Sequence, residues 1–290
     1  MRNTMDCVII GCGPAGVSAA LYVARANLKV TVIGGDESAL MKAEKIENYY
    51  GLQESLMGKT LFEAGLRQLE RLGVERIRDD VVDITWENAF TLTCAGGEEI
   101  DAASVIFCTG AKRMRASIEN LQAFEGRGVS YCAICDAFFY RNKAVAVLGS
   151  GAYALHEAMA LLPVAESVTL LTNGQPLAAS YPETIKIIDK PIHALQGDDK
   201  LTSVCFADGD KLAAAGLFVA IGTAGASDLA RKLGVEVRGS DIVTNENMET
   251  MLPGLFAAGD CTGGILQVST AVAEGAKAGM SAVRFLRSRT

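Results

Sequence analysis

The chain has 290 residues, of which half are hydrophobic and 21% are charged, which indicates a folded protein large enough for two domains. Its formal net charge of −7 argues against a protein built to bind nucleic acid. The sequence holds no run of 18 apolar residues and no cleavage site after its polar N-terminal segment, so we expect a cytoplasmic protein without a membrane-spanning helix.

The first predicted unit is a strand, a glycine-rich turn, a helix and a second strand. The strand covers residues 6–10, the helix runs from 17 to about 27, and the second strand covers 29–33. Between strand and helix stands the turn Gly11-Cys12-Gly13-Pro14-Ala15-Gly16. This order is typical of a dinucleotide-binding βαβ unit, in which glycines let a pyrophosphate approach the N-terminus of the helix. Gly34-Gly35 occupies the position where an acidic residue usually binds a ribose, so the ribose contact stays open.

The next segments predict a helix over 62–72, a hairpin over 81–93 and a strand over 104–111 that ends in a glycine turn. A second strand–turn–helix–strand unit follows. Its strands cover 144–148 and 168–171, its turn is Gly149-Ser150-Gly151-Ala152-Tyr153-Ala154, and its helix runs to about 162. A later strand, 216–222, mirrors the strand 104–111. The pattern therefore predicts an α/β protein with two Rossmann-like domains.

The last predicted elements are a strand over 254–260, which ends in Asp260, and a long helix from about 267 to 285. Alanine and glycine are frequent in this helix, and small side chains permit close packing against a cofactor or another helix. Ordinary core packing explains the same composition equally well.

The segment Cys132-Ala133-Ile134-Cys135-Asp136 carries the most specific chemistry in the chain. Two cysteines with two residues between them can close a disulfide, and the neighbouring acid can move protons. The other cysteines are scattered singly and are expected to behave as small hydrophobic residues: Cys7, Cys12, Cys94, Cys108, Cys205 and Cys261. One pair supplies too few ligands for a structural zinc site or an iron–sulfur cluster, and neither His156 nor His193 stands in a cluster, so we expect no metal site.

Five motifs carry a resemblance that extends over essentially the whole chain. They are the turn 11–16, Glu47-Asn48-Tyr49-Tyr50-Gly51, Cys108-Thr109-Gly110-Ala111, the segment 132–136, and Gly259-Asp260 followed by Gln267. In their order and spacing, the chain resembles the low-molecular-weight thioredoxin reductases. The resemblance implies an FAD domain at 1–112 and 240–290, with a dithiol domain, similar to the NADPH domain of the family, inserted at 113–239. It also implies a homodimer that reduces thioredoxin.

The same resemblance assigns residues to the flavin site. Gly13, Ala15 and Gly16 would meet the FAD pyrophosphate, and Asn48 would lie near the flavin. Asp260, Gln267 and Val268 would contact the ribityl chain and the isoalloxazine ring. The full candidate set is Gly11, Gly13, Pro14, Ala15, Gly16, Asn48, Gly110, Gly259, Asp260, Gln267 and Val268. For the dithiol, the resemblance implies that Cys135 faces FAD, Cys132 attacks the substrate disulfide and Asp136 moves the proton.

The stretch that binds a nicotinamide nucleotide in related reductases lacks its charged residues here. Family members that use NADPH carry a His-Arg-Arg-x-x-x-Arg motif, whereas residues 172–178 of this chain read Thr-Asn-Gly-Gln-Pro-Leu-Ala. A charge-assisted hydrogen bond is worth about 1.5–3 kcal/mol, so losing several would cost about 5 kcal/mol and disable the site. Tyr153 is expected to crowd the pyrophosphate as well, unless its ring packs inward. The segment 172–212 also looks shortened relative to the family.

One subset of these flavoproteins, the ferredoxin-dependent flavin thioredoxin reductases, lacks the same motif, and the chain is similar to that subset. We therefore expect reduced ferredoxin as the electron donor. A plant-type ferredoxin at about −400 mV lies roughly 130 mV below a thioredoxin at about −270 mV, which supplies about 6 kcal/mol per two electrons. Ferredoxins are acidic, so docking needs a basic face, for which the candidates are Lys112, Arg113, Arg115, Arg127, Arg141 and Lys143.

Three other functions stay open on the sequence. A dithiol oxidase on the same scaffold would pass electrons from a small dithiol through FAD to oxygen. An NAD(P)H-dependent thioredoxin reductase would bind its nucleotide by unfamiliar contacts. A flavin-binding module without turnover would act as a redox sensor, but the intact motif at 132–136 argues against it.

Overall fold

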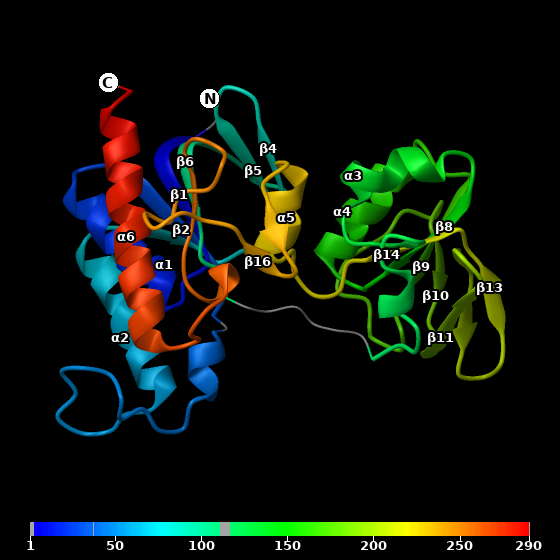
Figure 1. Cartoon of the computed structure of the whole chain (residues 1–290), viewed down its shortest axis with the longest axis horizontal. Coiled ribbons are helices and arrows are strands. Elements are labelled where there is room, and N and C mark those ends of the chain that lie inside the picture. The colour runs from blue at the N-terminus through cyan, green and yellow to red at the C-terminus, as the bar shows by residue number, and fades with distance from the viewer. Residues whose placement is uncertain (1–2, 37, 111–116, 290) are drawn as a thin grey trace. The chain divides into compact units, whose positions relative to one another are not determined.

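The structure is a computed structural model, and it describes residues 3–36, 38–110 and 117–289 (Figure 1). The chain forms two compact units. Unit 1 combines Met1–Arg113 with Gly225–Thr290, and unit 2 is the intervening segment Met114–Ala224. The predicted α/β class, with one domain inserted into the other, is confirmed.

The compact unit 1 resumes at Gly225, ahead of the boundary predicted at 240. Helix α5 (Ala226–Lys232) packs against strands β4 (Val81–Trp86) and β16 (Asp241–Ile242), both of unit 1. Lys232 at the end of α5 donates through Nζ to Asp83 Oδ1 of β4 at 3.0 Å, and both side chains are buried or nearly so. This ion pair and the packing of α5 attach residues 226–232 to the first unit, which no sequence pattern near residue 225 indicates.

Unit 1 is built on a seven-stranded sheet with the order β3-β2-β1-β6-β5-β4, and β17 pairs with β6 beside this path. The strands not yet bounded are β1 (Asn3–Ile10), β2 (Val30–Ile33), β3 (Glu75–Ile77), β5 (Phe90–Cys94), β6 (Glu99–Phe107) and β17 (Leu255–Ala257). The central pairs are parallel, with Ile10 opposite Ile33 on one side and Phe107 on the other. β1 and β6 therefore end at the same edge, where the first glycine turn begins.

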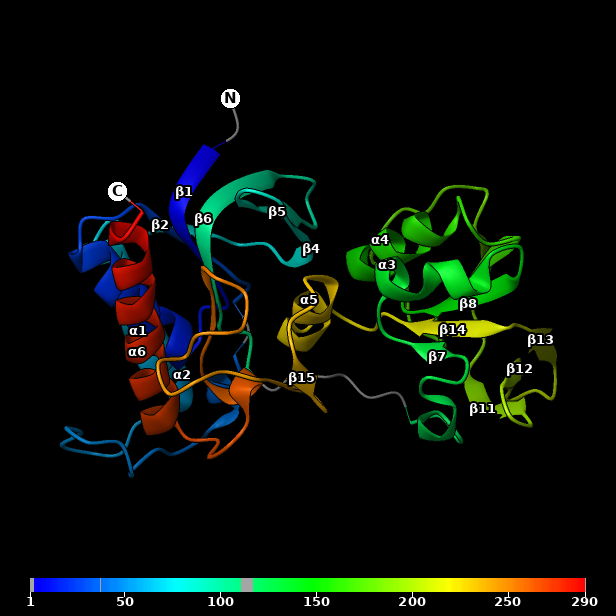
Figure 2. The ribbon, with the colours of Figure 1, turned by 45° about the horizontal axis from the view of Figure 1, so that its top comes forward.

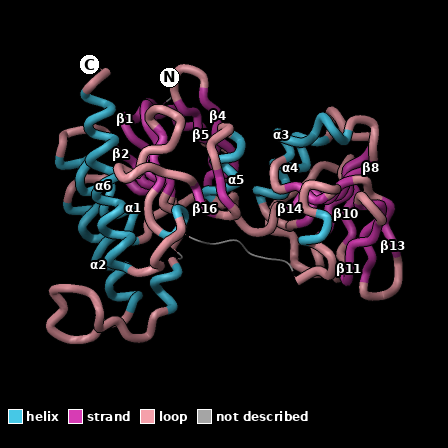
Figure 3. Tube along the Cα trace, viewed as in Figure 1, coloured by secondary structure: helices cyan, strands magenta, loops and turns pink. Residues whose placement is uncertain are grey.

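Three helices of unit 1 lie side by side, as Figures 1 and 3 show: α1 (Pro14–Arg25), α2 (Gly58–Arg71) and α6 (Val268–Arg287). Contact between α1 and α6 depends on glycine. A Cβ atom at Gly275 would lie 2.1 Å from the carbonyl oxygen of Ala15, and one at Gly279 would lie 2.6 Å from that of Ala19. The small residues of the last helix therefore let its backbone touch the helix that follows the first glycine turn.

Unit 2 has a parallel five-stranded sheet with the order β10-β9-β8-β14-β7; Figure 2 shows β8, β14 and β7 next to one another. These strands are β7 (Val129–Ser130), β8 (Ala144–Leu148), β9 (Ser167–Leu171), β10 (Lys186–Ile188) and β14 (Gly216–Val219). Helix α4 (Ala152–Leu161) follows β8, and the short helix α3 (Ala133–Asp136) follows β7. An antiparallel sheet, β11 (Ile192–Gly197), β12 (Leu201–Phe206) and β13 (Lys211–Ala213), has no counterpart in the sequence prediction.

The other predicted elements are confirmed, with shifted ends. The first helix runs from Pro14 to Arg25. It begins earlier than predicted because proline is well suited to the first helical turn. The strand predicted from 104 begins at Glu99, since β6 extends to pair with β5. The strands predicted to reach 222 and 260 end at Val219 and Ala257. Among the described residues, no helix is long and apolar enough to cross a membrane.

Candidate functional site

The first glycine turn of unit 1 forms a cradle between β1 and α1. Gly11 has a φ of +108°, and a Cβ atom there would lie 2.2 Å from the carbonyl oxygen of Cys108. A Cβ atom at Gly16 would lie 1.8 Å from the carbonyl oxygen of Gly11. Neither position accepts a side chain, so the backbone at the N-terminus of α1 stays within reach of a ligand.

The start of α1 suits a phosphate. Gly13 caps the helix without a side-chain hydrogen bond, Pro14 occupies the first turn, and that turn holds no acidic residue. A Cβ atom at Gly13 would meet only Ser38 Oγ, at 3.6 Å, among the described residues. The N–H groups and the positive end of the helix dipole therefore meet no acidic residue in the first turn of the helix, which fits the pyrophosphate of a dinucleotide.

The end of β17 joins this cradle. Gly259 has a φ of +81°, and a Cβ atom there would lie 2.9 Å from Cβ of Ala15. The backbone N–H of Gly259 donates to Glu274 Oε2 at 2.8 Å, and Thr262 Oγ1 donates to the same oxygen at 3.1 Å. Glu274, which the sequence prediction missed, thus fixes the segment that presents Asp260. Partial burial raises the pKa of the Asp260 carboxyl.

Two further predicted flavin-site residues meet across the chain. Asn48 Nδ2 donates to Gln267 Oε1 at 3.0 Å, and both side chains are exposed. Val268, partly buried, begins α6 directly after Gln267. Gly110 follows β6 with a φ of +76°, and no atom of the described residues lies within 4 Å of its Cβ position. The structure therefore gathers 11–16, 259–260 and the pair 48 and 267 within unit 1, and this set of residues fits FAD.

Arg76 of β3 binds the residues that follow β2, where a ribose-binding acid was sought. Arg76 donates through Nη2 to the carbonyl oxygens of Gly34 and Gly35, at 3.1 and 2.7 Å. It also pairs with Asp36 Oδ1 at 2.7 Å, and this hydrogen bond lowers the pKa of the Asp36 carboxyl. Asp36 is thus an ionised partner of Arg76, and the next acid along the chain, Glu37, lies outside the described residues.

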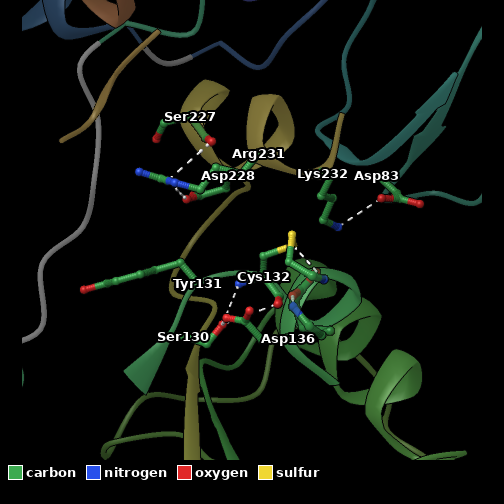
Figure 4. The surroundings of a disulfide bond; sticks show 12 residues. Asp83, Ser130, Tyr131, Cys132, Asp136, Ser227, Asp228, Arg231 and Lys232 are labelled. Carbon is green, nitrogen blue, oxygen red and sulfur yellow. Dashed lines mark hydrogen bonds and ion pairs between the residues drawn. A yellow bond between two sulfur atoms is a disulfide. The ribbon is translucent and has the colours of Figure 1, made fainter. Parts of the chain in front are cut away.

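Cys132 and Cys135 of unit 2 are joined by a disulfide (Figure 4), with their Cα atoms 5.3 Å apart. Cys132 caps α3: its Sγ accepts a hydrogen bond from the backbone N–H of Cys135 at 3.2 Å. Cys132 is buried, whereas Cys135 is exposed. The disulfide thus spans the first turn of a short helix, with one sulfur protected and the other accessible.

Ser130 connects the disulfide to the neighbouring acid. Its Oγ donates to Asp136 Oδ2 at 2.7 Å and accepts from the backbone N–H of Cys132 at 3.1 Å (Figure 4). Ser130 is buried and Asp136 is partly buried. The hydroxyl therefore holds the carboxyl group of Asp136 close to the backbone of the disulfide helix.

Glu157 of α4 holds the other side of that helix. Its Oε2 accepts from the backbone N–H of Ala133, between the two cysteines, at 2.6 Å, and both residues are buried. The sequence prediction missed Ser130 and Glu157. A signal for Glu157 exists, because it falls on the same helical face as the buried Tyr153, Ala154 and Leu161.

The second glycine turn keeps the backbone of a dinucleotide fold. Gly149 has a φ of +153°, and a Cβ atom there would lie 2.2 Å from the carbonyl oxygen of Ala220. The expectation that Tyr153 crowds a pyrophosphate is wrong. Its ring is 2% exposed and its hydroxyl donates to the carbonyl oxygen of Tyr131 at 3.3 Å, so the inward-packing alternative holds.

The residues after β9, where a basic motif would bind NADPH, form hydrogen bonds within unit 2 instead. Thr172 Oγ1 donates to Asp189 Oδ1 at 2.5 Å, and Asn173 Oδ1 accepts from the backbone N–H of Ile192 at 2.6 Å. Asn173 and Gly174 have φ values of +54° and +77°, a tight turn that two arginines would strain. These residues bind neighbouring loops of unit 2 and carry no positive charge.

The proposed basic face is described only in part, because Lys112, Arg113 and Arg115 lie outside the described residues. Arg127 donates through Nη2 to the carbonyl oxygen of Ala123 at 2.5 Å, and Lys143 through Nζ to that of Phe139 at 3.0 Å. Arg141 is exposed.

An aromatic pair lies directly after the disulfide helix. Phe138 and Phe139 are 75% and 67% exposed, and their rings meet edge to face. Ile134, between the two cysteines, is 52% exposed. These three side chains form an apolar patch beside the disulfide, which we name the aromatic patch.

The six single cysteines are free and buried, as predicted. Burial raises the pKa of Cys7 and of Cys261 to about 12, so neither thiol ionises at neutral pH. Within the described residues, no group of three or more His, Cys, Asp or Glu side chains is arranged to hold a metal ion.

Comparison with known proteins gives consistent matches over the whole chain. Residues 5–275 match the family of pyridine nucleotide-disulphide oxidoreductases. A thioredoxin reductase of Streptomyces coelicolor is 36% identical over an alignment 306 positions long, which covers 99% of this chain and 95% of that protein. The structure of an atypical thioredoxin reductase from Desulfovibrio vulgaris Hildenborough is 39% identical, with a TM-score of 0.92 and 99% of each chain covered. A ferredoxin-flavin thioredoxin reductase from Clostridium acetobutylicum is 30% identical, with a TM-score of 0.74 over 99% of this chain and 100% of that one.

Proposed function

The chain belongs to the pyridine nucleotide-disulphide oxidoreductases and, within them, to the thioredoxin reductases, and from this premise we propose that its electron donor is reduced ferredoxin. As a member of this family it is a flavoprotein that binds FAD. The electrons then pass to the Cys132–Cys135 disulfide and on to thioredoxin. The similarity to a ferredoxin-flavin thioredoxin reductase supports this donor.

The observation that carries the proposal is the turn after β9. Its residues hold Asp189 and Ile192 through hydrogen bonds, and none of them is basic. This stretch therefore offers no cation to the 2′-phosphate of NADPH. The positive φ values of residues 173 and 174 also disfavour an arginine at either position. A protein that donates single electrons needs no nucleotide-binding site on the enzyme, because the electrons do not come from a bound nucleotide.

FAD is held, in this proposal, by the cradle 11–16 with Gly259 and Asp260, and by Asn48 with Gln267. When bound, FAD would supply the conversion of single electrons into electron pairs. The residues of the cradle orient the cofactor: backbone N–H groups of α1 bind the pyrophosphate, and Glu274 fixes the segment that carries Asp260.

The thiol chemistry uses two electrons and two protons. The pair of electrons breaks the bond between Cys132 and Cys135, which leaves two sulfurs in the thiol or thiolate form. The Cys132 thiolate attacks the disulfide of thioredoxin, and one thioredoxin sulfur leaves as a thiolate. The Cys135 thiolate then attacks Cys132, which restores the disulfide and releases the second thioredoxin sulfur. Asp136, held by Ser130, carries protons to the departing sulfurs.

Thioredoxin docks, we propose, on the aromatic patch. Exposed aromatic side chains are enriched at sites that bind other proteins, and these follow the disulfide helix directly. Docking there brings the substrate disulfide next to helix α3, which contains Cys135 and is capped by Cys132.

A reconstituted turnover assay tests the proposal. Thioredoxin thiols are counted after mixing the holoenzyme with photochemically reduced ferredoxin, with NADPH or with NADH, and the Cys135→Ser variant serves as the control. We expect a rate with ferredoxin at least about 100-fold above that with NADPH, because the charge-assisted bonds to its 2′-phosphate are missing. We expect a similar difference from NADH, because residues 172–178 hold no acid to bind its ribose hydroxyl. An equal or higher rate with NADPH would overturn the choice of donor. Oxygen uptake with a small dithiol, without thioredoxin reduction, would support the oxidase instead.

A further inference from the structure

Residues 177–181, which we name the covering segment, lie against the second glycine turn of unit 2. The backbone N–H of Ala178 donates to the carbonyl oxygen of Ser150 at 2.8 Å. The Tyr181 hydroxyl donates to the carbonyl oxygen of Gly151, also at 2.8 Å. The covering segment therefore makes direct hydrogen bonds to two consecutive residues of the turn.

These bonds place protein atoms beside the turn on which a dinucleotide would lie. In a dinucleotide fold, the pyrophosphate lies directly on the backbone of the glycine turn at the start of the following helix. The turn itself is intact here, because Gly149 keeps its positive φ and its close approach to Ala220. The covering segment binds the carbonyl oxygens of residues 150 and 151, so a dinucleotide laid on this turn would have to compete with residues 177–181 for the approach to its backbone.

We propose that Tyr181 is a residue that determines donor specificity, by anchoring the covering segment over the second glycine turn and so excluding pyridine nucleotides. This inference rests on the proposed donor but explains the exclusion by a contact, in addition to the missing positive charge. Tyr181 is suited to the role: its side chain is partly buried, and burial raises the pKa of its hydroxyl to about 12. The hydroxyl thus remains a hydrogen-bond donor at neutral pH.

The inference predicts that releasing Tyr181 opens a site that the wild-type protein lacks. We would measure binding of NAD⁺ and NADP⁺ to the holoenzyme by equilibrium dialysis, in the wild type and in Tyr181→Gly, Tyr181→Phe and Leu177→Ser. Leu177→Ser is the matched control, since Leu177 is an exposed member of the same segment. Flavin content and cysteine thiols after reduction are compared across the set to show that each variant is folded.

We expect Tyr181→Phe to bind both nucleotides about tenfold more tightly than the wild type, which corresponds to the loss of one anchoring hydrogen bond, and Tyr181→Gly to bind them more tightly still, because it loses the ring as well. Leu177→Ser should show no gain. No gain in Tyr181→Gly, or an equal gain in Leu177→Ser, would overturn the inference; if Tyr181→Gly loses its flavin, the Tyr181→Phe result decides. Tight binding of NADP⁺ and reduction by NADPH in the wild type would instead contradict the proposed donor, whatever Tyr181 does.

Discussion

Ser130 and Glu157 explain how a helix of four residues holds a disulfide in a defined position. So short a helix is not stable by itself, because its backbone bonds do not offset the entropy of ordering it. Here the N–H groups of Cys132 and Ala133 donate to Ser130 and Glu157, both buried. The cysteine motif was evident in the sequence. Glu157 falls on the buried face of a predicted helix, but nothing in the sequence linked it, or the nearby Ser130, to the backbone of the disulfide helix.

Replacing each cysteine separately identifies which sulfur attacks thioredoxin. Cys132→Ser and Cys135→Ser should each lower the turnover more than about 1,000-fold, since the dithiol is lost. Only Cys135→Ser should trap thioredoxin as a stable mixed disulfide, visible on a non-reducing gel, because the attacking Cys132 remains. Cys135 is the more exposed of the two cysteines in this structure. If only Cys132→Ser traps thioredoxin, Cys135 is the attacking sulfur and the two roles are reversed.

Asp260, a predicted flavin-site residue, should lower the stability of the folded protein when its carboxyl group is ionised, so its effect should depend on pH. Burial raises the pKa of this carboxyl, so its ionised form is less favourable in the folded protein than in the unfolded one. Its contribution to folding is complete below the ordinary carboxyl pKa and is lost as the pH rises through the raised value. Asp260→Asn should therefore raise the Tm of the flavin-free full chain at pH 7 and leave it unchanged near about pH 3.5, measured by circular dichroism. A lower Tm at pH 7 would contradict the sign.

At the scale of elements, the close contact of α1 and α6 connects the last helix to the cofactor cradle. Gly275→Ala would place a methyl group 2.1 Å from the carbonyl oxygen of Ala15, a backbone atom that cannot move without shifting the cradle. Overpacking of this kind costs about 1–3 kcal/mol, and we expect a lower free energy of unfolding in urea and a lower flavin content. Lys277→Ala, at an exposed position of the same helix, is the control. A Gly275→Ala protein with wild-type stability would show that the two helices are free to separate.

The aromatic patch gives a prediction about substrate recognition. Phe138→Ala together with Phe139→Ala should raise the KM for thioredoxin about tenfold, because truncating interface aromatics commonly costs more than 1 kcal/mol. The Tm should change little, since both rings are exposed. Phe124→Ala is a contrasting control: Phe124 is buried in the core of the same unit, so its loss should lower the Tm. An unchanged KM in the double variant would place the docking surface elsewhere.

Strong local patterns made most elements predictable, whereas other elements depend on distant contacts. The two glycine turns and their flanking apolar runs identified β1, α1, β8 and α4 to within a few residues. The sheet β11–β12–β13 was missed, because its strands carry polar residues at irregular positions and the pairing of β11 with β12 has register shifts. Tyr181 also had no signal in the sequence, since its partner Gly151 is thirty positions away.

For the whole molecule, the sequence predicted the family and the insertion of one domain into the other. It did not predict that the second segment of unit 1 begins at Gly225. Helix α5 belongs to unit 1 through packing and through Lys232 and Asp83, far apart in the chain. The homodimer implied by the resemblance stays a prediction. Light scattering should give a mass near twice 30.5 kDa, and a monomeric mass would refute it.

The most direct test of the account is an anaerobic titration of the oxidised holoenzyme, followed by the flavin absorbance. Reduced ferredoxin should bleach the flavin in proportion to the electrons added, and the bleached enzyme should then reduce added thioredoxin in a stoichiometric amount. NADPH and NADH, each in large excess, should leave the yellow colour unchanged. Rapid bleaching by a small amount of NADPH would contradict the electron donor, and a flavin that ferredoxin cannot reduce would contradict the path from that donor to the disulfide.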